Sequence, residues 1–77
     1  MTIRELTFGE RAVGLTFNPS GHPGVQVVKE AYASLIDLLN LQRENATDPE
    51  AKRLASIAIT EAQGAQMWAV KAITWGA

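Results

Sequence analysis

The stretch "DPEAKRLASIAITEAQGAQMWAVKAITW", residues 48–75, contains the most regular pattern of the chain. Within it alanines recur at alternating steps of four and three residues: Ala51, Ala55, Ala58, Ala62, Ala65, Ala69 and Ala72. This heptad spacing predicts a long helix, and its small side chains let a second helix axis approach closely. The close partner is either the preceding helical segment or a second copy of the same helix.

The start of this helix is indicated by several neighbouring residues. Pro49 suits the first helical turn, and either Thr47 or Asp48 can cap it. Thr47 and Glu50 also have the spacing of a capping box. Because no proline follows Pro49, we expect the helix to run over about 48–75.

The segment before it, "GVQVVKEAYASLIDLLNLQ" at residues 24–42, has the period of an amphipathic helix. It predicts a helix over about 20–41, joined to the long helix by a loop of about seven residues, which is typical of an αα-hairpin. The predicted fold is therefore all-α: an antiparallel helical hairpin forming one domain over 1–77, with a short N-terminal element at 1–17.

The N-terminal element has two interpretations. The run "TFGE", from Thr7 to Glu10, matches a capping box and indicates a short helix. Val13, Leu15 and Phe17 alternate with smaller or polar residues, which suits an extended segment. The sequence leaves both alternatives open.

The chain has 77 residues, no cysteine and one histidine. Such a short chain buries only about 60% of the surface of its unfolded form and usually needs an additional source of stability. Disulfides and a Cys/His zinc site are excluded by composition. We therefore expect a homo-oligomer.

Seven basic and eight acidic residues give a net charge of -1. This balance argues against binding DNA or an anionic membrane through bulk charge. No segment resembles a signal peptide or a membrane-spanning helix. One histidine, no cysteine and scattered carboxylates form no catalytic set. We expect a soluble protein that is not an enzyme and has no metal or cofactor.

The stretch "FNPSGHPG", residues 17–24, leads directly into the first long helix. Its backbone N–H groups near the helix start form a candidate anion site, although Asn18 to Gly21 also have the composition of an ordinary turn. Lys29 and Tyr32 follow closely and offer, with Phe17, an ammonium group for a phosphate and rings for base stacking. His22 is expected to be a surface residue.

On the long helix, Arg53, Ser56 and Thr60 share one face that combines a guanidinium with two hydroxyls. Trp68, Lys71 and Trp75 repeat this spacing, with hydrophobic interface as the simpler explanation of the tryptophans. Gly64 lies between the two groups at a cost of roughly 1 kcal/mol relative to alanine. A close approach by another backbone or by a ligand would explain it.

The runs "RELTFGERAVGLTFNPSG", "VKEAYASLIDLL" and "EAQGAQMWAVKAIT" resemble small phage proteins of the anti-CBASS cyclic-oligonucleotide sponge family, whose helical hairpin domain also occurs in a Thoeris anti-defence sponge. The resemblance implies a homo-oligomer, typically a hexamer, in the host bacterial cytoplasm. It also implies binding of cyclic dinucleotides, and in some members cyclic trinucleotides in a separate pocket, without cleavage.

The resemblance further implies roles for individual residues. A dinucleotide pocket between protomers would use an aromatic residue and a lysine, here Phe8 or Phe17 with Lys29. Separately from these implied roles, we expect the loop, with Asn18 and Ser20, to form one wall of a ligand pocket. A trinucleotide pocket would use Arg53 and Thr60. A sponge for cyclic ADP-ribose-type signals and a structural, protein-binding helical module are the alternative functions.

Overall fold

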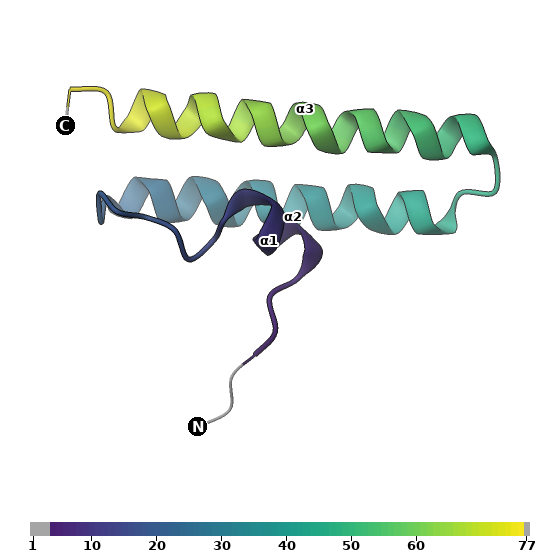
Figure 1. The fold of residues 1–77 in the computed structure, drawn as a ribbon, viewed down its shortest axis with the longest axis horizontal. Helices are drawn as coiled ribbons and strands as arrows, with labels where there is room; N and C mark the ends of the chain where they lie inside the picture. The colour runs from purple at the N-terminus through teal and green to yellow at the C-terminus, as the bar shows by residue number, and fades with distance from the viewer. Residues whose placement is uncertain (1–3, 77) are drawn as a thin grey trace.

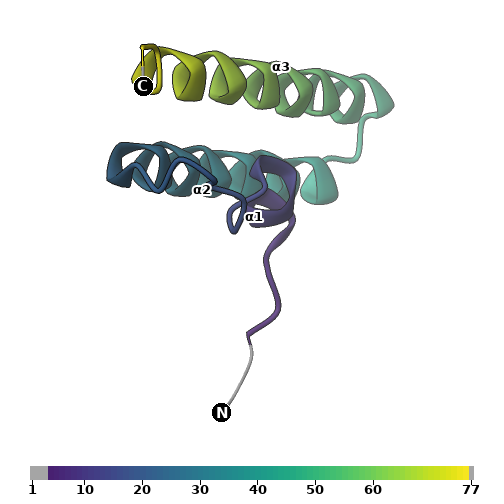
Figure 2. The ribbon, with the colours of Figure 1, turned by 60° about the vertical axis from the view of Figure 1, so that its left-hand side comes forward.

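The computed structural model describes residues 4–76, and these form three helices and no strand. Helix α2 (Pro23–Asn45) and helix α3 (Pro49–Ile73) run antiparallel as a hairpin, and the short helix α1 (Phe8–Val13) lies across α2 (Figures 1 and 2). The all-helical prediction is confirmed. The predicted hairpin helices are both present, with α2 starting later and ending later than the predicted range of about 20–41.

Helix α1 is set by a complete capping box. The Thr7 hydroxyl accepts a hydrogen bond from the Glu10 amide at 3.1 Å, and the Thr7 amide donates to the Glu10 carboxylate at 2.8 Å. Gly14 ends the helix in the left-handed conformation, with φ of 63°. Of the two alternatives, the capping motif is confirmed, and Leu15 follows in a turn rather than in an extended segment.

The two long helices begin at Pro23 and Pro49, each in a first-turn position. Asp48 caps α3 by accepting a hydrogen bond from the Glu50 amide at 2.8 Å. His22 caps α2: its Nδ1 accepts from the Gly24 amide at 2.9 Å. Histidine is not among the preferred capping residues, so this role of His22 was not predicted.

The core lies where all three helices meet. Ile36 of α2 is completely buried, between Val13 of α1 and Ile59 of α3 in one apolar cluster with Ala33 and Ala62. Burying a side chain of this size contributes about 1.5–3 kcal/mol. Helix α2 is therefore covered on two sides, by α1 and by α3.

The alanine heptad does not face α2 as a whole. Ala62 is buried and Ala55, Ala58 and Ala69 are half-buried, whereas Ala51, Ala65 and Ala72 are exposed. The hairpin contact is centred instead on Ile59, Ala62 and Gln66, which are the buried residues of α3. Of the two predicted partners for the alanine seam, α2 therefore contacts only part of it, and a second copy of the helix stays a prediction.

Gly9 is a point of close approach between α1 and α2. A Cβ atom at this position would lie 2.0 Å from the Ala33 carbonyl oxygen, and the Gly9 amide donates to the Asp37 carboxylate at 2.7 Å. Only glycine fits this crossing without movement of α1.

Replacing Gly9 with alanine should lower the free energy of unfolding by about 1–3 kcal/mol, because the added methyl group overlaps backbone atoms of α2. Denaturant unfolding followed by circular dichroism measures this loss. Ser34→Ala, on the exposed side of α2, is the control and should change the value by less than about 0.5 kcal/mol. Equal stability of Gly9→Ala and Ser34→Ala would contradict the observed crossing.

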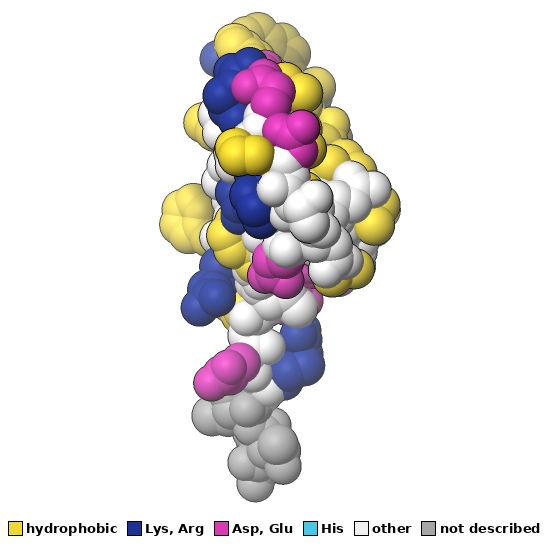
Figure 3. Space-filling view, turned by 90° about the vertical axis from the view of Figure 1, so that its right-hand side faces the viewer, with side chains coloured by type: hydrophobic (Ala, Val, Ile, Leu, Met, Phe, Trp, Pro, Cys, Tyr) yellow, Lys and Arg dark blue, Asp and Glu magenta, His cyan; other side chains and the backbone are white. Residues whose placement is uncertain are grey.

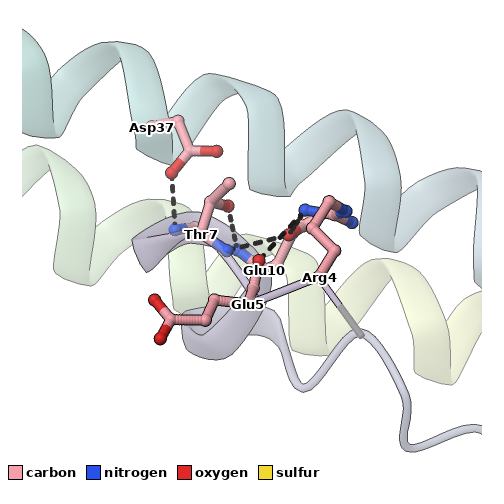
Figure 4. A network of polar contacts seen from close by, with 6 residues as sticks. Arg4, Glu5, Thr7, Glu10 and Asp37 are labelled. Atoms are coloured by element: carbon pink, nitrogen blue, oxygen red, sulfur yellow. Dashed lines mark hydrogen bonds and ion pairs between the residues drawn. The ribbon is translucent and has the colours of Figure 1, made fainter. Parts of the chain in front are cut away.

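Arg4 and Glu10 form an ion pair at 2.8 Å through two hydrogen bonds, beside the capping box of α1 (Figure 4). The Arg4 guanidinium, together with the Thr7 amide, lowers the pKa of the Glu10 carboxyl from its ordinary value of 4.5 to about 2. The ionised form of Glu10 therefore stabilises the folded state above about pH 4.5, and this stabilisation is lost as the pH falls through about 2.

Acidification from pH 5 to pH 2 should therefore destabilise the wild type more than the Glu10→Gln variant, whose neutral amide can still accept from Thr7. Thermal unfolding at closely spaced pH values gives the two curves. The other carboxylates contribute equally to the wild type and to Glu10→Gln. The difference in melting temperature between the two proteins should therefore shrink as the pH approaches 2. Parallel curves would show that the Glu10 contacts do not stabilise α1.

Candidate functional site

A hollow of about 220 Å³ lies between the loop before α2, the first turns of α2 and the last turns of α3; we call it the loop pocket. Its lining combines one aromatic ring, one ammonium group and several small polar groups with two valines. The lining residues are Phe17, Asn18, Pro19, Ser20, Val25, Lys29, Val70 and Thr74. Four of the eight binding residues predicted from the sequence are thus brought together here: Phe17, Asn18, Ser20 and Lys29.

Lys29 lies at the base of the loop pocket and is only 5% exposed. Its ammonium group donates to the Gly14 carbonyl at 2.9 Å and to the Phe17 carbonyl, and lies 5.5 Å from the centre of the Phe17 ring. An ammonium group has three donors, so two are committed to the backbone and one is left for a ligand. Lys29 therefore fixes the pocket wall in addition to supplying its positive charge.

The loop itself uses the amides that were expected to face an anion. The Gly21 amide donates to the Asn18 carbonyl at 3.1 Å, and the His22 amide donates to the Ser20 hydroxyl at 3.2 Å. At the helix start the Gly24 amide donates to the His22 Nδ1 atom, and the Val25 amide donates to the His22 carbonyl. The amides of Gly21, His22 and Gly24 therefore bond within the turn and the helix cap, which favours the ordinary-turn alternative over the candidate anion site.

Phe17 and Thr74 supply two of the accessible surfaces of the loop pocket. The Phe17 side chain is 70% exposed, so most of its ring area is open to a planar group. The Thr74 hydroxyl donates to the Val70 carbonyl at 2.8 Å and keeps its own lone pairs for a donor. The pocket can thus stack a ring and form a small number of directed hydrogen bonds.

Tyr32 and Phe8 lie outside the loop pocket. Tyr32 is partly buried against the core and lines a separate hollow of about 190 Å³ with Ala31 and Leu35. Phe8, on α1, lies under the Arg43 guanidinium, which is 5.4 Å from the ring centre. The expected grouping of Tyr32 with Phe17 and Lys29 around one ligand is therefore not present within one chain.

Within residues 4–76 of one chain, Arg53 and Thr60 do not line a common pocket. The Arg53 guanidinium pairs with the Glu50 carboxylate in the first turns of α3, and the Thr60 hydroxyl donates to the Ser56 carbonyl at 3.2 Å. Figure 3 views the molecule from the end where α2 turns into α3, and basic and acidic side chains lie next to each other there. Both residues remain predictions as ligand contacts.

Four lining residues were not predicted as binding residues from the sequence: Pro19, Val25, Val70 and Thr74. Antiparallel pairing of the predicted helices places the end of α3 beside the start of α2, and this register was the signal that would have found the two residues of α3. Among residues 4–76, no group of histidine, cysteine and acidic side chains could hold a metal ion, and no helix has the length and apolarity required to cross a membrane.

Comparison with protein-family models gives a match to the Acb2/Tad1 hairpin domain over residues 10–74. The matched range contains most of α1, both long helices and the whole of the loop pocket. Comparisons with curated proteins and with solved structures gave no match.

Replacing Lys29 with methionine should lower the free energy of unfolding by about 1–3 kcal/mol, because the Gly14 and Phe17 carbonyls lose a buried donor. Amide hydrogen exchange should also become faster at Phe17 and its loop neighbours. Lys52→Met, at an exposed lysine that donates to the Arg43 carbonyl, is the control. If Lys29→Met is as stable as this control, the ammonium does not hold the loop.

Proposed function

Because the match covers most of its length, this protein belongs to the Acb2/Tad1 hairpin-domain family, and we propose that it sequesters cyclic oligonucleotide second messengers. Cyclic dinucleotides are the main proposed ligands, with cyclic trinucleotides as a further class. Sequestration in the host bacterial cytoplasm during phage infection would keep the CBASS effector inactive. The proposal combines family membership with the chemistry of the loop pocket.

The observation that carries the proposal is the placement of an open aromatic ring beside a fixed cation. The Phe17 ring offers a stacking surface for a nucleobase, and such stacking contributes about 1–3 kcal/mol per base. The remaining N–H donor of Lys29 offers a contact for a phosphate oxygen, and the lone pairs of the Thr74 hydroxyl can accept a hydrogen bond from a ribose hydroxyl or a base N–H. This combination suits a nucleotide better than a purely apolar ligand.

The size of the loop pocket supports a site shared between chains. Its volume of about 220 Å³ is below the roughly 300–1,000 Å³ typical of pockets that enclose a drug-sized ligand. One chain therefore holds part of a cyclic dinucleotide, and a second protomer would cover the rest. We propose a homo-oligomer, with the hexamer implied by the family resemblance as the expected form.

The proposed action is binding without cleavage. Hydrolysis of a phosphodiester needs a positioned base, nucleophile or metal, whereas Lys29 and Thr74 donate to backbone carbonyls. The recovered ligand should be intact after the complex is denatured. The family resemblance also includes a Thoeris anti-defence sponge, so cyclic ADP-ribose-type signals are the second candidate ligand class.

Calorimetric titration with cyclic dinucleotides, cyclic trinucleotides and cyclic ADP-ribose isomers tests the proposal directly. We expect tight binding of a cyclic dinucleotide and a loss of at least tenfold in affinity in Phe17→Leu, because leucine keeps the bulk but not the stacking face. Phe8→Leu is the matched control, since Phe8 lies on α1 outside the loop pocket.

Each outcome of this titration is informative. If none of these ligands gives a binding heat, the sponge function is excluded and a structural, protein-binding module is left. Binding that weakens in Phe8→Leu but not in Phe17→Leu would move the site to α1. Chromatography of the ligand released on denaturation completes the test, because a linear product would identify an enzyme.

A further inference from the structure

The outer face of α3 carries large apolar side chains that no other part of the described chain covers. Trp68 is 72% exposed, Trp75 is 78% exposed and Ile57 is 43% exposed. The Cα atoms extend only 13 Å along the shortest axis, so one chain is too thin to bury both sides of its hairpin. Two open tryptophans on one helix of a small protein mark an interaction surface.

These side chains belong to a second heptad seam on α3, separate from the face that contacts α2. The residues of this outer seam are Ile57, Glu61, Gly64, Trp68, Lys71 and Trp75, at alternating steps of four and three. At 100° per residue they form one stripe along the helix. The buried residues Ile59, Ala62 and Gln66 lie on the other side.

The outer seam is complementary to itself when two copies are laid antiparallel. With a two-fold axis passing near residue 66, Trp68 lies opposite Gly64, Glu61 lies opposite Lys71 and Ile57 lies opposite Trp75. Each contact occurs twice, as an isologous interface requires. The Trp68 ring faces the position without a side chain at Gly64, the Glu61 carboxylate faces the Lys71 ammonium, and the aliphatic Ile57 faces the Trp75 ring.

Two structural observations support this register. A Cβ atom at Gly64 would have no atom within 4 Å, so nothing inside the chain requires a glycine there, although it weakens the helix. A hollow of about 280 Å³ also opens at this point, lined by Gly64, Met67, Trp68 and Lys71. An indole ring from a second copy would enter this hollow.

We infer that α3 forms an antiparallel, two-fold contact with α3 of a second copy through the outer seam, with each Trp68 ring seated over the partner copy's glycine. This inference specifies a surface for the self-association included in the proposed function, and it does not depend on the ligand. The loop-pocket residues Val70 and Thr74 lie on a different side of α3, so the contact leaves the loop pocket open.

Charge reversal tests the register. Glu61 and Lys71 are ten residues apart, about 15 Å along the helix, and do not contact each other within one chain. Glu61→Lys or Lys71→Glu alone should weaken association at least tenfold in analytical ultracentrifugation, because like charges then face each other. The double variant Glu61→Lys/Lys71→Glu should restore it, and circular dichroism should show equal helicity throughout.

Trp68→Ala and Leu38→Ala separate this surface from the outer face of α2, where Leu38 is exposed. We expect Trp68→Ala to reduce the assembly to smaller species that retain the wild-type fold. Assembly that responds only to Leu38→Ala, or charge-reversed singles that associate like the wild type, would overturn the inference while leaving the ligand proposal intact. A wild type that is monomeric at high concentration would overturn both the inference and the proposed homo-oligomer.

Discussion

The structure depends on the convergence of three helices around Ile36. A hairpin of two helices covers only one side of each helix, and a chain of this size has few apolar residues to spare. Helix α1 supplies the missing cover for α2, and it reaches its place because Gly9 has no side chain to keep it away from Ala33. The short N-terminal helix is therefore a part of the core and not an appendage.

The position of α1 in turn decides the shape of the loop pocket. After Gly14 the chain runs back to the start of α2. The Lys29 ammonium holds this segment by donating hydrogen bonds to the Gly14 and Phe17 carbonyls. The same ammonium lies beside the Phe17 ring, so one buried cation orients both the backbone and the aromatic wall. Core, loop and pocket are thus one connected arrangement.

The fold was largely predictable from the sequence, because capping residues and apolar periodicity are local signals. The Thr7 capping box, Asp48 and Pro49 mark real helix starts. The alanine heptad was misleading in detail, since small side chains permit contact on either side and do not say which side faces α2. The side of α3 that faces α2 is the one that carries Ile59, because burying this larger apolar side chain stabilises the fold more than burying an alanine.

The candidate site was predicted less completely, because it joins residues that are far apart in the sequence. Phe17, Asn18, Ser20 and Lys29 were found since they cluster along the chain, whereas Thr74 comes from the opposite end of the hairpin. Several amides of the candidate anion site bond within the turn itself, a balance of donors and acceptors that composition does not reveal. Tyr32 was misplaced because its position on α2 turns it toward the core.

The separation of two faces on α3 has a consequence for how such a protein can evolve. Val70 and Thr74 line the loop pocket, while the outer stripe with Trp68 and Trp75 faces away from α2. Substitutions on separate faces of a helix that share no partner have nearly additive effects. Mutations that adapt the loop pocket to a chemically different ligand can therefore accumulate without changing the outer seam.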